Sequence, residues 1–328
     1  MNNKCEEKLV SVVIPTWNRY EMVKSCIESV LRSDYKNIEI IIIDNASTDG
    51  TSDLLNRDFS DEPRVKIWRL NKNLMAAGGR NAGLSHANGE LILILDNDNI
   101  IHNDMISKLV EAMEKKEDAS FMGALTINVK SNTIWVLRGA YQNFWTSRSY
   151  AYGDGLPADD IDSFEEYYQT MGAPNAFMIR RNVIDVIGGF DEEFYAMYEE
   201  IDFAYRMQKA GMKAYLCTGA RTDHYGYVAD NQSAKLRQLG IEDVDRTYHF
   251  ARNRFIMEKK FAKWYQRFVF YLLFANIYTV YYSYIAIKEG RKDIAKAYIK
   301  GAMDGYKYKC QKDIFCNYKH TEDIVEVK

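Results

Sequence analysis

The sequence has 328 residues, which is enough for one large α/β domain with an appendage or for two modest domains. Hydrophobic residues make up 47% of the chain and charged residues 27%, a composition that excludes global disorder. The formal net charge of −3 is close to neutral, so the composition gives no support for nucleic-acid binding by bulk electrostatics.

The cysteines and the N-terminal segment indicate a reducing compartment. None of the five cysteines forms a C-x-x-C pair, and they stand at Cys5, Cys26, Cys217, Cys310 and Cys316. This scatter favours free thiols over disulfides or a zinc site. The segment 1–9 is polar and charged and lacks the apolar core of a signal peptide. We therefore expect a cytoplasmic protein.

The first hundred residues alternate apolar runs with helical patterns. The predicted strands cover 9–15, 38–43, 65–70 and 91–95, and the predicted helices cover 20–32, 78–87 and a segment through Leu55 capped by Ser47 or Thr48. Repeated βα units of this length predict a mostly parallel, doubly wound sheet with right-handed crossovers. Ligands bind such sheets beyond the carboxyl ends of the strands.

The pattern changes twice beyond residue 100. Residues 121–177 are irregular and rich in Tyr and Trp, as expected for loops and short strands that cover a pocket. A helix near 199–210 and a strand near 213–216 follow. A long helical pattern then dominates, and we place a boundary near Asn231.

Acidic residues follow two of the predicted strands. Asp96 and Asp98 stand two positions apart, so an extended backbone would point both carboxylates to the same side. Two carboxylates brought together repel and favour Mg²⁺ or Mn²⁺, usually shared with substrate phosphates. A turn rich in Asp and Asn that merely ends the strand explains the same pattern. Asp44 likewise fits either a helix cap or an acceptor for the ring N–H of uracil or thymine.

Two common nucleotide-binding classes are disfavoured by their missing motifs. A dinucleotide-binding site needs G-x-G-x-x-G after the first strand, where this chain has Pro15-Thr16-Trp17-Asn18-Arg19. The phosphate-binding loop G-x-x-x-x-G-K-[ST] is also absent from the sequence.

Seven motifs together carry a family resemblance. They are Val12-Val13-Ile14-Pro15-Thr16-Trp17-Asn18-Arg19, Ile43-Asp44-Asn45-Ala46-Ser47-Thr48-Asp49-Gly50, Asn71-Lys72-Asn73 with Gly78-Gly79-Arg80-Asn81-Ala82-Gly83, Leu95-Asp96-Asn97-Asp98, Gly188-Gly189-Phe190-Asp191-Glu192-Glu193-Phe194, Glu199-Glu200-Ile201-Asp202-Phe203 with Arg206, and His224. Their order resembles glycosyltransferase family 2, and the whole set looks like its rhamnosyltransferase-like branch. The resemblance covers about two-thirds of the chain.

The resemblance implies a GT-A fold over residues 1–230, followed by a helical region at 231–328. The nucleotide-sugar half would occupy about 1–100 and the acceptor half about 101–230. It also implies an inverting glycosyltransferase that moves a sugar from a nucleotide-diphosphate donor to a hydroxyl of a glycan or lipid-linked acceptor, in the assembly of surface polysaccharides or glycoconjugates. Asp44, if it faces a ring N–H, favours UDP- or dTDP-sugars.

The resemblance also assigns site residues. The donor residues would be Thr16, Asn18, Arg19, Asp44, Asn73, Arg80, Asp96 and Asn97. Asp98 would be the main ligand of Mn²⁺ or Mg²⁺, with Asp96 and His224 as further ligands. A single histidine can equally be a hydrogen-bonded structural residue.

The catalytic base is expected in the segment that begins at Glu199. The family pattern there is usually Glu-Asp-x-Asp, and Glu200 replaces the commoner Asp with a side chain one methylene longer. We assign Glu200 as the base and place Glu199, Asp202 and Asn175 on the acceptor side or in support. Because a helix dipole favours acids at its N-terminus, part of this cluster has a second explanation. The aromatic residues Trp135, Tyr141, Trp145 and Tyr152 fit either sugar stacking or ordinary packing.

Two other functions are weighed against transfer. A sugar nucleotidyltransferase would need a Gly-rich, Lys-bearing loop after the first strand, which this chain lacks. A non-catalytic nucleotide- or carbohydrate-binding protein on the same scaffold stays open, although Asp44, Asp96, Asp98, Glu200 and His224 are all intact.

The segment 268–287 contains twenty residues and no charge, which reaches the length of a membrane-spanning helix. Basic residues flank it on both sides, whereas a spanning helix usually has its positive flank on one side. Three positions therefore stay open for it: a peripheral contact of 252–292 with the inner face of the cell membrane, packing on the catalytic domain, or a homodimer contact.

Overall fold

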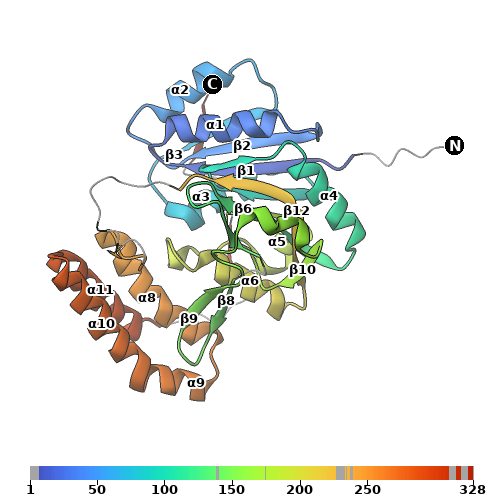
Figure 1. The fold of residues 1–328 in the computed structure, drawn as a ribbon. Helices are drawn as coiled ribbons and strands as arrows, with labels where there is room; N and C mark the ends of the chain where they lie inside the picture. Colours follow the sequence, from blue (N-terminus) through green and yellow to red (C-terminus); the bar gives the residue numbers. More distant parts are fainter. Residues whose placement is uncertain are drawn as a thin grey trace.

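A mixed sheet forms the centre of the computed structural model, which describes residues 7–137, 140–173, 175–226, 233, 235–236, 239–309, 315–318 and 324–327 (Figure 1). Over these residues the sheet has 11 strands, nine of them in the order β10-β12-β6-β11-β4-β1-β2-β3-β13. β1 (Val10–Thr16), β2 (Ile38–Asp44), β3 (Val65–Leu70) and β4 (Leu91–Leu95) pair in parallel, and a second parallel pair joins the strands at 119–128 and 213–224. The predicted doubly wound α/β fold with a helical C-terminal region is confirmed.

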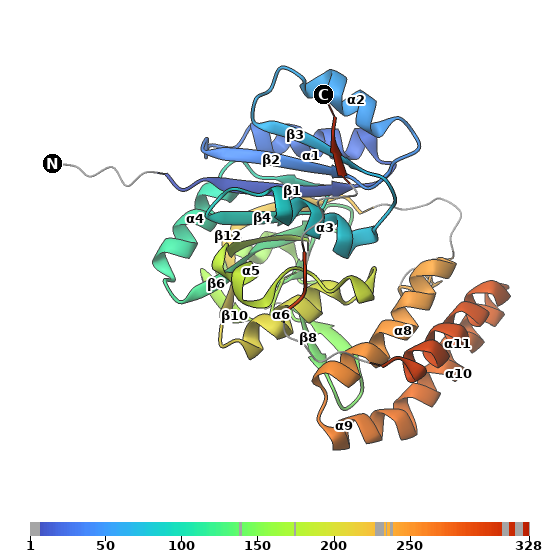
Figure 2. The same ribbon diagram turned by 180° about the vertical axis from the view of Figure 1, so that it is seen from behind.

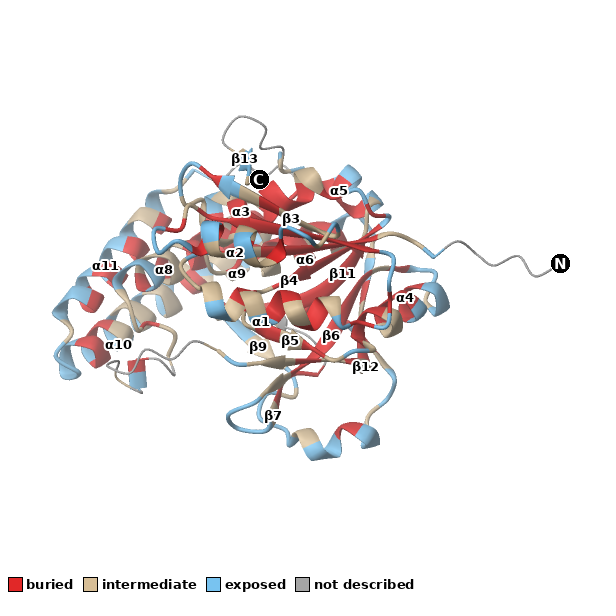
Figure 3. Ribbon diagram, turned by 90° about the horizontal axis from the view of Figure 1, so that it is seen from above, coloured by how far each residue is buried: buried red, intermediate tan, exposed pale blue. Residues whose placement is uncertain are grey.

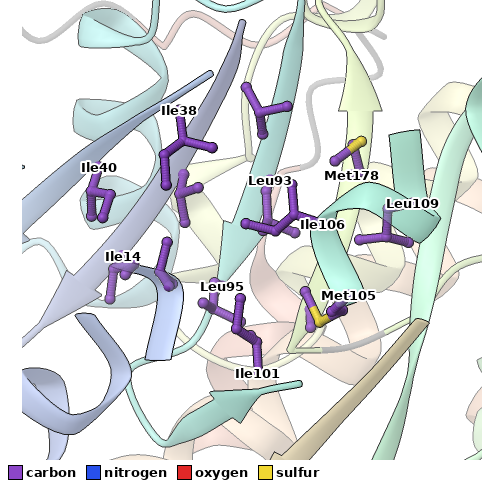
Figure 4. Close-up of a cluster of buried hydrophobic side chains, with 14 of the residues drawn as sticks. Ile14, Ile38, Ile40, Leu93, Leu95, Ile101, Met105, Ile106, Leu109 and Met178 are labelled. Carbon is purple, nitrogen blue, oxygen red and sulfur yellow. The ribbon is translucent and has the colours of Figure 1, made fainter. Parts of the chain in front are cut away.

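Both faces of the sheet are covered, which explains the nearly continuous apolar strands. Helices α1 (Tyr20–Leu31), α2 (Thr51–Phe59) and α4 (Met105–Lys115) contribute to one core, part of which is shown in Figure 4. The second core includes residues of α3 (Met75–His86), α5 (Asn182–Ile187) and α6 (Glu199–Lys209). Neighbouring strand residues alternate between the cores: Ile14 and Leu93 belong to the first, and Val13 and Ile94 to the second.

The expectation that 121–177 is irregular is wrong at both ends of that segment. β6 (Ala119–Asn128) and β11 (Ala176–Arg180) are internal strands, and β11 runs antiparallel to both β4 and β6. Gly123 interrupts the apolar pattern of β6 because a Cβ there would lie 2.4 Å from the Ala173 Cβ. The close approach of Ala173 thus requires a glycine within a core strand, and this glycine makes the strand hard to recognise in the sequence.

Three predicted boundaries also differ from the structure. The N-cap of α2 is Gly50, with φ of 85°, so Ser47 and Thr48 do not cap this helix. Helix α3 begins at Met75 rather than Gly78, and β12 (Lys213–His224) continues eight residues beyond the predicted end at Leu216. This extension brings the end of β12 alongside β5 (Asn99–Ile101).

Short elements surround the second half of the sheet. They are β7 (Thr133–Val136), the hairpin of β8 (Ala140–Asn143) and β9 (Arg148–Ala151), β10 (Tyr167–Thr170), and the 3₁₀ helices Ala158–Ser163 and Glu192–Phe194. β7 pairs with β6, and β10 pairs with β12.

The C-terminal helices form a separate layer beside the sheet domain, as Figure 2 shows. They are α8 (Val244–Phe261), α9 (Trp264–Val269), a π-helical turn at Phe270–Phe274, α10 (Ala275–Lys288) and α11 (Lys292–Lys307). Helices α8 and α11 touch backbone to backbone, because a Cβ on Gly301 would lie 2.3 Å from the Tyr248 carbonyl oxygen. By length and composition, the continuous helix Trp264–Lys288 is the one described helix apolar enough to cross a membrane.

The helical stretch ends at Lys307, and the chain then returns to the sheet. Cys316 forms an isolated bridge with Gly188, and β13 (Ile324–Glu326) pairs antiparallel with β3. The last described residues are therefore an edge strand and not part of the helical region. Cys5, Cys310 and the predicted boundary at Asn231 lie outside the described residues.

Candidate active site

Arg80 is the centre of a buried charge cluster. Its Nη1 donates to Glu199 Oε1 at 2.9 Å, and its Nη2 lies 2.7 Å from Asp96 Oδ1 and 2.6 Å from Glu200 Oε1. The Arg80 residue is 3% exposed. One guanidinium thus joins the end of β4 to the start of α6, and with all three carboxylates ionised the cluster keeps a net negative charge.

The sequence of α3 allows this position for Arg80. A Cβ on Gly83 would lie 2.1 Å from Val13 Cγ1, so a glycine is required for α3 to approach β1 this closely. Asn81, the residue after Arg80, accepts from the Phe190 N–H at 2.7 Å and donates to the Phe190 carbonyl at 2.9 Å. The Gly-rich motif and the Gly188–Phe194 motif therefore hold each other in place.

Glu200 is the carboxylate with the most perturbed acidity in the cluster. Burial raises its pKa to about 8, and the charges of Asp96 and Glu199 add to the effect. Arg80 and the backbone N–H of Asn175 act in the opposite direction by stabilising the charged form. A general base is most efficient when its pKa lies near the working pH, and Glu200 meets that condition.

The loop before Glu199 has an unusual backbone that α8 supports. Tyr195, Met197 and Tyr198 have φ of 63°, 71° and 74°, in the left-handed region that non-glycine residues rarely adopt. The Asn253 side-chain amide lies within hydrogen-bond distance of the carbonyls of Phe194 (2.6 Å), Ala196 (2.8 Å) and Met197 (2.9 Å). Helix α8 therefore fixes the approach of the chain to the carboxylates.

Asp202 lies apart from the Arg80 cluster although it was predicted beside it. The carboxylate is fully buried, binds Arg206 Nε at 2.6 Å and also pairs with Lys260. Lys260 in turn binds Asp191 at 2.6 Å. Asp202 thus compensates two buried cations, Arg206 on α6 itself and Lys260 on α8, and its removal would leave buried charge uncompensated.

The strand pairing explains how Asp98 and His224 meet. β5 and β12 pair with His224 opposite Asn99, and the Tyr225 N–H donates to the Asp98 carbonyl at 3.1 Å. His224 Nε2 lies 3.4 Å from Asp98 Oδ2, and Arg19 Nη1 lies 3.7 Å from the same oxygen. Burial opposes ionisation of Asp98, but His224 and Arg19 hold its pKa below the ordinary value.

The arrangement of Asp98 and His224 is better explained as a binding site for a divalent cation than as a purely structural contact. Asp98 Oδ1 is buried without a hydrogen-bond partner, so one carboxylate oxygen is left for another ligand. In the described part of the chain no three metal-ligating side chains gather, and Asp96 is engaged by Arg80. Mg²⁺ and related cations are commonly held by one or two protein ligands together with substrate phosphates, which matches Asp98 and His224.

The remaining predicted donor residues mostly shape the strand ends. Asn97 donates to the Thr16 hydroxyl at 2.9 Å, and Asn18 Oδ1 accepts from the Thr48 N–H at 2.7 Å. Asn73 closes a local turn by accepting from the Met75 N–H at 2.7 Å.

Asp44 is fully buried in this structure. Its carboxylate accepts from the Ser47 N–H at 3.0 Å and from the Ser52 hydroxyl. A ring N–H can reach this carboxylate only if the loop that starts at Asn45 moves aside. In the conformation described, Asp44 organises that loop.

A small pocket adjoins His224. It has a volume of about 150 Å³ and is lined by Asn128, Thr133, Trp135, Asp154 and His224. The Trp135 and His224 rings lie 4.5 Å apart, so this tryptophan borders the Asp98 pair. The other aromatic residues considered lie elsewhere: Tyr141 stacks between Tyr150 and Tyr152, and Trp145 lies 5.5 Å from the Tyr265 ring.

Sequence reasoning missed the residues of α8 that support the site. Asn253 and Lys260 stand in a helical run with no motif around them, and their partners lie about sixty residues earlier in the chain. Both side chains are buried in the structure, which the helical pattern of the sequence does not indicate.

Residues 11–188, more than half of the chain, match the model of Glycosyl transferase family 2. "Glycosyltransferase GlyG" of Streptococcus pneumoniae serotype 4 is 34% identical over 110 residues, covering 34% of this chain and 36% of that protein. This chain therefore matches about a third of that relative's length. The "GalNAc(5)-diNAcBac-PP-undecaprenol beta-1,3-glucosyltransferase" of Campylobacter jejuni is 25% identical over 289 residues, covering 83% of this chain and 85% of that enzyme.

A solved structure supports the fold assignment. "Mannosyltransferase PcManGT from Pyrobaculum calidifontis in complex with GDP-Man and Mn2+" superposes with a TM-score of 0.56 at 14% identity, covering 92% of this chain and 88% of that one. At this identity the likeness shows the GT-A fold alone.

Proposed function

This chain belongs to glycosyl transferase family 2, and from that premise we propose that it transfers a sugar with inversion from a nucleotide-diphosphate donor to a hydroxyl acceptor. The observation that carries the proposal is that Arg80 pairs with both Glu200 and Asp96. Asp96 in turn stands two positions before Asp98, the proposed cation ligand. A base and a diphosphate-cation site are the two parts that a single displacement requires.

Glu200 supplies the base in this proposal. Its carboxylate accepts the proton of the acceptor hydroxyl as the hydroxyl oxygen attacks the anomeric carbon and the bond to the diphosphate breaks. Arg80 holds the carboxylate in place through Nη2, and Glu199 and Asp96 set the charge around it. One displacement on the face opposite the leaving group inverts the anomeric configuration.

Asp98 and His224 would hold Mn²⁺ or Mg²⁺. When bound, the cation neutralises charge that develops on the leaving diphosphate. Asp98 keeps a low pKa, so its carboxylate is ionised and ready to bind at neutral pH. The Mn²⁺ in the mannosyltransferase complex supports a divalent cation here.

The donor is proposed to be a UDP- or dTDP-sugar, in keeping with the motifs of the rhamnosyltransferase-like branch. This choice rests on Asp44 at the end of β2 and needs the loop from Asn45 to open. The acceptor is proposed to be a glycan or lipid-linked sugar in surface polysaccharide assembly. The name of the Campylobacter enzyme, which includes an undecaprenol-linked acceptor, supports this class.

A panel of UDP-, dTDP- and GDP-sugars tests the proposal. Nucleotide release and thermal shift are measured with Mn²⁺, with Mg²⁺ and with a chelator. We expect a metal-dependent shift with a uridine or thymidine nucleotide and slow release of that nucleotide. A shift without release for any donor and acceptor would favour a non-catalytic binding protein, and a shift with GDP alone would reject the donor assignment.

A further inference from the structure

The helix Trp264–Lys288 exposes an apolar face along its whole length. Exposed apolar side chains recur every three to five residues, at Trp264, Phe268, Leu272, Ile277, Val280 and Tyr284. Trp264 is 73% exposed and Val280 is 70% exposed. At 1.5 Å per residue, the 25-residue helix extends this face over about 37 Å. In Figure 3, α10 carries exposed residues within the group of C-terminal helices.

Side chains of the opposite face are packed. Phe270, Ile285 and Ala286 belong to the core that also contains Phe255 of α8 and Tyr298 of α11. The helix is therefore held in place by its neighbours, and what it exposes is a fixed surface. An exposed apolar patch of this extent on a folded domain marks an interaction site.

Positive charge surrounds the two ends of this face. Between Trp264 and Ile287 the only charged residue is Arg267, and Lys263 stands immediately before the helix. Lys288, Arg291 and Lys292 follow its other end, together with Glu289 and Asp293. Over residues 288–307, which include α11 packed alongside the helix, six basic and three acidic side chains give a net charge of +3. One of the acids, Asp293, is paired with Arg291 at 2.7 Å. An apolar centre with Trp and Tyr and with basic ends matches the layers of an anionic phospholipid surface.

We propose that this helix face docks the protein in the plane of an anionic phospholipid bilayer. The apolar side chains enter the boundary between headgroups and acyl chains, and the lysines at the ends contact lipid phosphates. Trp145 at the tip of the β8–β9 hairpin lies against Tyr265 and is 48% exposed, so it extends the surface onto the sheet domain.

Two other arrangements fit the structure less well. A spanning helix would draw the neighbouring α11 into the bilayer, since Ile285 and Tyr298 share one core, and α11 exposes Lys292, Lys296 and Lys300. In a two-fold dimer of this face, the basic ends would meet basic ends whether the helices ran parallel or antiparallel. A lipid surface of opposite charge avoids both conflicts.

Vesicle flotation of the full chain tests the proposal without any sugar substrate, so its result is independent of transferase activity. We expect the protein to float with vesicles of phosphatidylcholine and phosphatidylglycerol and not with phosphatidylcholine alone. Lys292→Gln and Lys296→Gln should each lower the partition coefficient about fivefold. The pair Leu272→Glu and Ile277→Glu should lower it at least about tenfold.

Val186→Glu is the matched control, because Val186 is an apolar side chain, 50% exposed, on α5 of the sheet domain. It should float like the unchanged protein, and equal melting temperatures establish that all variants are folded. Absence of flotation with either vesicle would overturn the proposal. If the protein resists extraction by alkaline carbonate, the helix spans the membrane instead of lying on it. If the Glu pair dissociates a dimer but leaves flotation unchanged, the face binds a second copy of the chain and not lipid.

Discussion

Arg80 Nη2 lies 2.6 Å from Glu200 Oε1, a buried contact between residues 120 positions apart in the chain. The same nitrogen binds Asp96, so one ion-pair cluster connects Glu200, the residue assigned as base, with the strand end that leads to Asp98. Changes at any of these positions should therefore alter the acidity of Glu200 as well as the local contacts.

Glu200→Gln should lower kcat by about 10²–10⁴-fold, because the amide cannot accept the acceptor proton. Nucleotide affinity should stay unchanged, since the amide oxygen keeps an acceptor for Arg80. Steady-state kinetics and nucleotide thermal shift check the two halves of this prediction. Glu114→Gln, on the exposed surface of α4, serves as control. Retained turnover would remove Glu200 from the role of base.

The pH dependence of kcat/KM should rise through a pKa of about 8, the value for Glu200. The sign follows from the role: the base works only when it is deprotonated, so activity is low below this pKa and reaches a plateau above it. A rate profile from about pH 4 to pH 9.5 checks it, because it covers both the ordinary carboxyl pKa and the raised one. A rising limb near pH 4.5 would show that the carboxyl is not perturbed in the working enzyme.

Arg80→Met should destabilise the fold by about 3–5 kcal/mol, because it leaves the buried Glu199 and the partly buried Asp96 and Glu200 without their cation. The pKa of Glu200 should rise further, since Arg80 is the largest influence that lowers it. Urea unfolding measures the first effect. Adding Glu199→Gln should restore part of the lost stability, whereas strictly additive effects would argue against a shared cluster.

Asp98→Asn should abolish the dependence of nucleotide binding on Mn²⁺ or Mg²⁺. The amide loses the charge that a hard cation prefers, although its size and its contact with His224 are kept. Thermal shift with nucleotide, with and without chelator, checks this outcome. Asp104→Asn, an exposed aspartate at the start of α4, should behave like the unchanged protein. A full metal response in Asp98→Asn would place the cation elsewhere.

Asn253→Ala should reduce kcat more than it changes KM for the donor, because it releases the loop that carries Glu199 and Glu200. The three carbonyls that share the two N–H hydrogens of the Asn253 amide lose them, and a stability loss of about 1–3 kcal/mol is expected. Kinetics and unfolding on the same preparation separate the two effects. A stability loss with kcat unchanged would mean that Asn253 supports only the fold.

The parallel half of the fold was readable from the sequence because its signals are local. β1, β2 and β4 are short, mostly apolar runs, β3 alternates apolar and polar residues, and each of the four is followed by polar residues. β6 and β11 escaped because their neighbours come from distant segments and Gly123 breaks the apolar pattern. The start of α2 was misplaced since Gly50, in a left-handed conformation, replaces the usual side-chain cap.

The site divides in the same way. Asp96 and Asp98 follow the end of β4, and His224 is the last residue of β12. Motif order was enough to suggest all three. The partners of Arg80 and the support from Asn253 depend on tertiary packing between helices far apart in sequence. No local pattern encodes which carbonyl or carboxylate such a side chain will meet.

The Asn253 contacts have a consequence for recombination between related enzymes. A chimera joined near residue 231 would exchange α8 while keeping the loop from Phe194 to Tyr198, and the three carbonyls would face a foreign helix. A crossover that preserves these contacts must lie upstream of Phe194 or beyond α8, so that the loop, α6 and α8 are inherited together. The C-terminal helices and the acidic segment they support thus form one exchangeable unit, although the linear order of the motifs suggests two.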